Sequence, residues 1–510
     1  MRKQRIPKKK NYDVIVIGSG IGGLSSATYL AQQGYSVLVM ERHYRAGGYA
    51  HSFRRRKYIF DSAVRIVAGA EEGGLLNRLL DQAGIADQLH FLKLDDVYTA
   101  YYPDFQLTVP SNIEGLIAKY SELFPHESTN IKALVQSMEA LYLATKKLLS
   151  ASSPFQFLSD PWIMKYNKKT FHEMVSEFLE DPKAIYSFST LWTHYGVPPT
   201  QGSAMYFSYA TMNYFKDGIY YLQGSFQKLA DAFVTRIEVL NGEVCLRNEV
   251  KKIVVEDNQT KGVELQTGEY IEAPIVVCNC DMLKMMGDLV GEEYFPNRYK
   301  KRISRLSASL SAFEVFLGVN LPLEEYNLSH ETFIYGDYDY DKTFESHLNL
   351  KENGQQGIRG VAISCPTLAD PSLAPEGKHT VVITTLVPYS ISNSWKNMKS
   401  DYEKLMIQWT EKVIPNLSQH LEWVESATPL TMERYTNNSY GSIYGWAQSL
   451  EQMATRPQHE TPIQGLFLSG QWTDPGGNVA SVLLSGYKLS EKIAAKARKE
   501  SVVAMQKVEG

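Results

Sequence analysis

Apolar residues occur along this chain in short unbroken runs and in stretches with helical spacing. Val14–Ile17 is an unbroken β-branched run, which predicts a strand buried on both faces of a parallel sheet. Apolar positions from Leu24 to Ala31 have helical spacing, and Gly34 is a natural residue to follow the end of that helix. A second apolar run, Ser36–Met40, predicts another strand. The chain therefore begins with a strand–helix–strand unit.

Similar patterns divide the rest of the chain. Residues 112–150 carry apolar side chains at three- to four-residue spacing and predict helices. Residues 243–281 read as paired strands that return to the first sheet, and residues 305–425 as mixed strand and helix. Residues 151–221 are rich in Phe, Trp and Tyr, which is typical either of a helical core or of a tunnel for a long apolar ligand.

A glycine-rich turn joins the first strand to the first helix. Gly18 permits the tight turn, Gly20 lets a pyrophosphate approach the backbone, and Gly23 lets the helix pack closely on the strand. Ile21 and Gly22 lie at the start of the helix, where free N–H groups and the helix dipole favour an anion. The turn predicts a site for the pyrophosphate of a dinucleotide.

Glu41 ends the second predicted strand, where a carboxylate accepts hydrogen bonds from ribose hydroxyls. An acid at this position argues against a 2′-phosphate, and so against NADP. The segment from Asp13 to Ser52 resembles the extended FAD fingerprint of the amine oxidase and phytoene desaturase superfamily. The resemblance implies FAD as the cofactor. It adds four residues to the predicted contacts: Arg42, Gly47, Gly48 and Tyr49.

A second glycine motif lies near the C-terminus, between a predicted strand at Gly465–Gly470 and a predicted helix from Ala480. With the first fingerprint, it resembles the closing FAD motif of the phytoene desaturase, carotenoid isomerase and retinol saturase family. The resemblance implies that Asp474 faces the ribityl-phosphate region and that the backbone of Val250 meets the adenine. The other implied cofactor residues here are Gly470, Gly477, Asn478 and Val479.

Two positions depart from that family pattern. Ala63 stands where the family commonly has a glycine two residues after the aspartate, here Asp61. Asn478 occupies a position that is often glycine. The substrate and the geometry at the face of the flavin therefore stay open.

The combined pattern predicts an α/β protein, with a Rossmann-type FAD-binding domain and an interleaved α+β substrate domain. We predict FAD-binding segments at 1–110, 218–304 and 426–510. We predict a helical substrate segment at 111–217 and a mixed one at 305–425.

Charge excludes one class of partner and suggests another. The net charge of −4 gives no general attraction to nucleic acid. Two basic runs, at residues 2–10 and 54–57, indicate either solvated surface or contact with anionic lipid head groups. No apolar run reaches the roughly 20 residues of a spanning helix. We therefore expect a cytoplasmic protein, either free or in contact with the membrane surface. The sequence does not determine the oligomeric state.

The four cysteines are scattered, and the histidines show no metal-ligand spacing, so we predict neither a disulfide framework nor a metal site. No acid or base stands out. Arg65 and Tyr444 are candidate catalytic residues at the flavin face because they lie near family motifs, although each fits a structural role equally well.

Three functions stay open. The first is a desaturase, isomerase or saturase of a lipophilic polyene, which is what the resemblance implies. The second is a flavin oxidase or dehydrogenase of an amine or another metabolite. The third is a flavin-free escort protein for prenyl chains, which has the same fold. The glycines at 18, 20, 23, 476 and 477 and the acid at 41 argue against the third.

Overall fold

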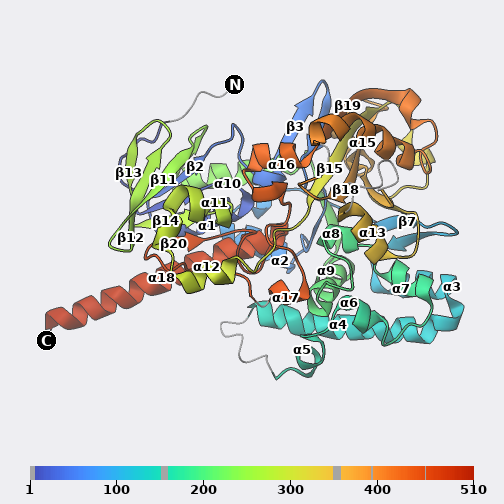
Figure 1. The fold of residues 1–510 in the computed structure, drawn as a ribbon, viewed down its shortest axis with the longest axis horizontal. Helices are drawn as coiled ribbons and strands as arrows, with labels where there is room; N and C mark the ends of the chain where they lie inside the picture. Colours follow the sequence, from blue (N-terminus) through green and yellow to red (C-terminus); the bar gives the residue numbers. More distant parts are fainter. Residues whose placement is uncertain (1–5, 151–158, 349–357, 392–393, 454, 510) are drawn as a thin grey trace.

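A five-stranded parallel sheet brings together strands from distant parts of the chain (Figure 1). The computed structural model describes residues 6–150, 159–348, 358–391, 394–453 and 455–509. The strands lie in the order β10 (Glu243–Leu246), β2 (Val37–Glu41), β1 (Val14–Ile17), β14 (Ile275–Cys278) and β20 (Leu466–Leu468). The predicted strand–helix–strand unit is confirmed, with its helix at α1 (Ile21–Gln32).

Both faces of this sheet are covered, which explains the unbroken apolar runs. Val14 and Val16 pack in a core with α1, α10 (Gln227–Val239) and α18 (Val479–Glu509). Ile15 and Ile17 point the other way. They pack with the three-stranded sheet of β11 (Val250–Glu256), β12 (Gln259–Leu265) and β13 (Tyr270–Glu272).

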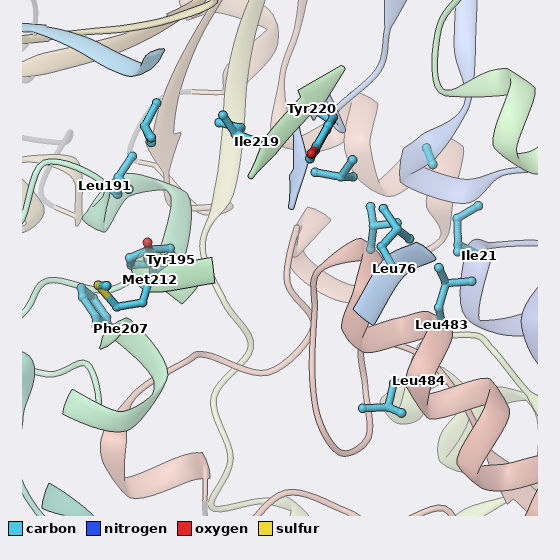
Figure 2. Close-up of a cluster of buried hydrophobic side chains, with 14 of the residues drawn as sticks. Ile21, Leu76, Leu191, Tyr195, Phe207, Met212, Ile219, Tyr220, Leu483 and Leu484 are labelled. Carbon is cyan, nitrogen blue, oxygen red and sulfur yellow. The ribbon is translucent and has the colours of Figure 1, made fainter. Parts of the chain in front are cut away.

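Helix α18 closes the fold by packing along α1, so the two ends of the chain form one layer. Figure 2 shows Ile21 of α1, Leu76 of α2 (Leu75–Ala83) and Leu483 of α18 gathered in the same core. A Cβ on Gly486 would lie 2.7 Å from the Cβ of Ser25, so glycine permits this close helix contact.

A second body is built on a seven-stranded sheet. Its strands lie in the order β19 (Leu421–Ala427), β15 (Ser311–Val319), β18 (His379–Val387), β17 (Gly360–Ser364), β16 (Glu331–Tyr335), β7 (Asp96–Tyr101) and β8 (Gln106–Pro110). The sequence assigns residues 1–110 to the FAD-binding part. However, β7 pairs in parallel with β16, so this part of the chain enters the second body before residue 96. A pairing between strands so far apart in the chain leaves no signal in local periodicity.

A helical layer lies beside this sheet (Figure 1). The helices predicted over residues 112–150 are confirmed as α3 (Ile113–Leu123) and α4 (Ser128–Ser150). The remaining helices of the layer are α5 (Pro161–Tyr166), α6 (Phe171–Val175), α7 (Pro182–Phe188), α8 (Trp192–Tyr195) and α9 (Ala204–Lys216). Residues 151–158 of the predicted aromatic segment lie outside the described residues.

The basic run at residues 54–57 forms the turn between β3 (Ser52–Arg55) and β4 (Tyr58–Asp61). Arg55 pairs with Glu425 of β19, with Nη2 2.9 Å from Oε1. Arg56 donates to the carbonyl of Glu422 at 3.1 Å. Two of the four basic side chains of this run therefore already make contacts with other residues of the protein. Within the part of the chain that the structure describes, no helix has the length and apolar character to cross a bilayer.

Candidate functional site

A cavity of about 620 Å³ is lined by residues of the five-stranded sheet, the seven-stranded sheet and the helical layer. Its volume lies within the usual range for cofactor and ligand pockets. One end lies at the glycine turn after β1, at the carboxyl ends of the parallel strands. The other end lies on the seven-stranded sheet.

Two glycine turns meet at the first end. Gly47 donates its N–H to the carbonyl of Ser19 at 2.8 Å and forms a parallel bridge with Gly20. Gly48 has a φ of +57°, and a Cβ there would lie 3.0 Å from the Cα of Gly20. The second glycine pair therefore packs directly on the first, and both line the cavity.

Asn279, which the sequence analysis did not identify as a site residue, lies between Gly20 of the first turn and Gly470 of the C-terminal motif. A Cβ on Gly20 would lie 2.7 Å from its Nδ2, and a Cβ on Gly470 would lie 2.2 Å from its Oδ1. Asn279 directly follows β14 and lines the cavity. Its position at the carboxyl end of a strand neighbouring β1 is the one available signal, since ligands of parallel sheets bind at that edge.

Glu41 lies at the end of β2 beside the turn. Its Oε2 accepts from the N–H of Ser19 at 2.8 Å, and its Oε1 accepts from the N–H of His43 at 2.7 Å. The hydroxyl of Ser19 also donates to Oε2 at 2.9 Å. These bonds fix the orientation of the carboxylate, and Oε1 keeps a further lone pair for another donor. Among the described residues, no side chain caps helix α1 at its N-cap Gly20, so its first N–H groups have no side-chain acceptor in this part of the chain.

The C-terminal motif reaches the same cavity through the start of α18. A Cβ on Gly477 would lie 2.9 Å from the carbonyl oxygen of Tyr444, so the two backbones are in contact. The side chain of Asn478 accepts from the N–H of Ser481 at 2.8 Å. This departure from the family pattern thus supplies a favourable N-cap for α18.

Most of the residues predicted to hold the cofactor come together. The structure places these at the cavity: Gly18, Gly20, Ile21, Gly22, Glu41, Arg42, Gly47, Gly48, Tyr49, Val250, Gly477, Asn478 and Val479. Three others do not line it: Gly23, Gly470 and Asp474. Gly23 and Gly470 instead pack against the turn: a Cβ on Gly23 would lie 2.2 Å from the carbonyl oxygen of Gly18, and a Cβ on Gly22 would lie 2.7 Å from the Cα of Gly470. The Asp474 carboxylate is instead near Arg456, His459 and Lys488. It raises the pKa values of these three groups, but the larger effect of burial lowers them below their usual values.

The seven-stranded sheet supplies the floor at the other end. Successive side chains of a strand point to opposite faces. One face of this sheet packs on α15 (Trp395–Thr410) through an apolar cluster that contains Phe313, Val361 and Ile383. The opposite face carries the small residues Ala312, Gly360 and Ala362, all of which line the cavity. Because the side chains in the centre of this face are small, they leave room above the sheet for the cavity.

Arg65 and Glu314 form a buried ion pair on this floor. Nη2 of Arg65 lies 2.5 Å from Oε1 of Glu314, and the two side chains are 8% and 3% exposed. Thr384, which faces Glu314 in the strand register, donates to the same carboxylate oxygen at 3.3 Å. Burial is the largest single effect and lowers the pKa of Arg65. The attraction and hydrogen bond of Glu314, together with the charges of Glu331 and Asp61, outweigh it and hold this pKa above its usual value.

Tyr444, the second candidate catalytic residue, lines the same cavity. Its ring packs over Gly196, where a Cβ would lie 2.8 Å from the ring and φ is +81°. Burial raises the pKa of Tyr444 well above its usual value, so the phenol stays protonated at neutral pH. The structure therefore brings Arg65 and Tyr444 to one space, although they are far apart in the sequence.

Further polar residues line the cavity without having been predicted. Glu331 of β16 accepts from Ser364 at 3.0 Å, and its Oε2 lies 3.5 Å from Nε2 of His194. Burial would raise the pKa of Glu331, but His194 and its other neighbours lower it below the usual value. His347 of α13 (Tyr340–Leu348) is buried, and neither ring nitrogen has a hydrogen-bond partner among the described residues.

Burial lowers the pKa of His347 to about 4, whereas an unfolded histidine titrates near 6.5. Between these values the unfolded chain binds more protons, so stability falls as the pH falls from about 6.5 towards 4. We expect His347→Leu to remove about 2 kcal/mol of the stability loss between pH 7 and pH 5. Urea unfolding at both pH values measures it. An unchanged pH dependence in the variant would contradict this origin.

Comparison with known proteins shows which proteins this chain resembles. A family model described as flavin containing amine oxidoreductase matches residues 21–494. All-trans-retinol 13,14-reductase of Rattus norvegicus is 26% identical, over 92% of this chain and 83% of that protein. A chloroplastic prolycopene isomerase of Daucus carota is 26% identical, over 96% and 81%. The crystal structure of an oxidoreductase from Methanosarcina mazei has a TM-score of 0.66 at 18% identity, covering 94% of this chain and 99% of that one.

Proposed function

The chain belongs to the flavin-containing amine oxidoreductase family, and on that premise we propose that it acts on the C–C or C=C bonds of a long apolar polyene. It is an FAD-dependent oxidoreductase. The proposed reaction is a desaturation, an isomerisation or a saturation. Retinol and prolycopene, named in two relatives, are both conjugated polyenes.

We propose that the glycine end of the cavity holds the FAD. The uncapped start of α1 and the turn at Gly18 and Gly20 suit the pyrophosphate, which requires N–H donors and close backbone approach. Glu41 would accept from the ribose hydroxyls, and the backbone of Val250 would meet the adenine. Gly477, at the start of α18, would pass along the flavin ring. Asp474 is left out of this set because it does not line the cavity.

The role of Glu41 gives a direct prediction. We expect Glu41→Gln to weaken FAD binding at least about tenfold, because hydrogen bonds to a charged group contribute about 1.5–3 kcal/mol. Titration of the apoprotein with FAD, followed by flavin fluorescence, measures the dissociation constant. Glu256→Gln, at an exposed position that ends β11, is the matched control and should bind as the wild type does. Equal affinities for the two variants would exclude the ribose contact.

The observation that carries the proposed substrate is the continuity of the cavity. The space that begins at the nucleotide end extends over an apolar floor that includes Ala362, Phe333 and Leu386. An elongated apolar chain can lie along this floor with one bond beside the flavin. Bound FAD would supply the hydride chemistry. The protein's residues would orient the chain, exclude water and keep the Arg65–Glu314 pair and the Tyr444 phenol at the reacting end.

Absorption spectroscopy tests this function. Phytoene or a poly-cis lycopene is added to the FAD-loaded protein without oxygen. Bleaching of the oxidised flavin bands indicates desaturation, and return of these bands in a sample reduced beforehand with dithionite indicates saturation. A shift of the polyene bands alone indicates isomerisation. Flavin bands that respond to an amine but to no polyene would replace the proposal with the amine reading. Failure to take up FAD would favour the prenyl-escort reading, which the glycine turns and Glu41 argue against.

A further inference from the structure

Arg456 is a buried cation that the function proposed above does not use. The residue is 2% exposed. Its Nη1 donates to the carbonyl of Pro475 at 3.3 Å. Its Nη2 donates to the carbonyls of Trp446 and Ala447 at 3.3 and 3.4 Å, and to Oε1 of Gln448 at 2.7 Å. The guanidinium therefore ties together two loops that are separate in the sequence.

These two loops form the wall of the cavity at the start of α18. Tyr444 and Gly477 line the cavity, and their backbones are in contact. A Cβ on Gly476 would lie 1.6 Å from Nη1 of Arg456, so the guanidinium packs against the backbone immediately before Gly477. Because consecutive Cα atoms are about 3.8 Å apart, the guanidinium lies within roughly 10 Å of any molecule that touches Gly477.

The guanidinium pairs with no carboxylate among the described residues, since the acceptors named above are all neutral oxygens. Burial lowers the pKa of Arg456, and Tyr206 and Asp474 raise it. Asp474 is half-buried and makes no hydrogen bond to Arg456 in the described part of the chain, so it offsets the charge only in part. A guanidinium stays protonated at neutral pH. The wall beside Gly477 is therefore positively charged.

A positive charge behind this wall favours a bound molecule whose charge becomes more negative during the reaction. Charges near the ring of a flavin tune its electronic properties in this way. At an effective dielectric constant of about 20, two unit charges roughly 10 Å apart change an equilibrium constant by about tenfold. The charge of Arg456 is thus large enough to alter the redox equilibrium of a cofactor at Gly477.

We propose that Arg456 raises the reduction potential of bound FAD, because its guanidinium holds the wall at Gly477 and places a positive charge behind it. This inference rests on the proposed position of the FAD. In a desaturation, the substrate loses a hydride from one carbon and a proton from the next, and a C=C bond forms between them. The flavin gains the two electrons and the proton of the hydride, and its charge becomes more negative by one. A raised potential therefore favours desaturation over saturation.

The wild type provides the first test. The midpoint potential of its bound FAD is measured by slow anaerobic reduction with xanthine and xanthine oxidase beside a reference dye. We expect this potential to lie at least about 30 mV above that of free FAD, which corresponds to about tenfold tighter binding of the reduced flavin. A potential at or below that of free FAD would overturn the proposal.

Two variants separate the charge of Arg456 from its hydrogen bonds. Arg456→Gln removes the charge and should lower the midpoint potential by about 30 mV, a tenfold change in the redox equilibrium. Arg456→Lys keeps the charge and should keep the potential near the wild-type value. Both variants lose hydrogen bonds to the loops and should unfold at lower urea concentrations. If both are less stable and their potentials are equal, the residue has only a structural role.

Two neighbouring positions complete the experiment. Nη2 of the exposed Arg302 donates to the carbonyl of Arg456 at 2.9 Å, so it holds the same segment from outside. Solvent screens its charge, and Arg302→Gln is the control that should leave the potential unchanged. Asp474→Asn removes the opposing carboxylate while Arg456 stays in place, so it should raise the potential. This variant decides the matter if Arg456→Gln does not fold, since an unchanged potential would show that charges at this wall do not act on the flavin.

The two proposals fail separately. If the wild type binds FAD and responds to polyenes but its potential is not raised, the proposed function stands and the role of Arg456 is wrong. If the potential is raised and falls in Arg456→Gln, while no polyene changes the flavin spectrum, the role of Arg456 stands and the proposed substrate is wrong.

Discussion

Replacing Gly23 by alanine is expected to yield a folded protein that lacks flavin. A Cβ at Gly23 would lie 2.2 Å from the carbonyl oxygen of Gly18 and 2.9 Å from the Cβ of Asn279. The first of these atoms is backbone, so the turn or the helix must move. Forcing such a shift costs about 1–3 kcal/mol, and each 1.4 kcal/mol is a tenfold change in affinity. We expect the affinity for FAD to fall about 5- to 140-fold, so the purified variant should retain much less flavin than the wild type.

Gly287→Ala is the matched control for that experiment. A Cβ at Gly287 meets nothing within 4 Å among the described atoms, and its φ lies outside the left-handed region. It should therefore keep the full flavin content. The ratio of flavin to protein absorbance gives the result, and circular dichroism shows whether each variant is folded. Full flavin content in Gly23→Ala would mean that the turn does not hold the cofactor.

The nucleotide end could be predicted because its signals are local in the sequence. Unbroken runs such as Val14–Ile17 require burial on both faces, and the glycines of the turn follow directly. The close packing predicted for Gly23 also follows from that short segment, since its neighbour is the turn itself. What could not be predicted was Asn279, which meets these glycines only after the parallel sheet has formed.

The other end of the cavity depends on register between strands that are distant in the chain. Glu314, Thr384 and Ala362 form one row only because β15, β18 and β17 pair in their observed register. A single strand does not show which of its two faces will meet a cavity. The same limit applies to Glu331 and His194, which come from a strand and a helix more than a hundred residues apart. Arg65 and Tyr444, which were chosen because they lie near family motifs, do line the cavity. Their position in the sequence did not show that Glu314 is the partner of Arg65.

Arg65→Met is expected to destabilise the protein by about 3–5 kcal/mol, because it leaves the Glu314 carboxylate buried without its cation. Glu314 is 3% exposed, so water compensates the lost guanidinium far less than it would at an exposed position. Within the described residues, Thr384 would be the hydrogen-bond donor left to it. Urea unfolding at pH 7 measures the change in the free energy of unfolding. A loss below about 1 kcal/mol, the usual value for an exposed pair, would contradict the buried ion pair.

The double variant Arg65→Met/Glu314→Leu separates structure from chemistry. Replacing both partners by apolar groups of similar size is often neutral for stability, so we expect most of the lost free energy to return. If Arg65 acts only by neutralising Glu314, flavin content and the response to polyenes should return as well. If the stable double variant binds flavin and no longer responds to any polyene, the ion pair itself acts on the substrate or the flavin. That outcome would show that Arg65 has a role in the reaction as well as in stability.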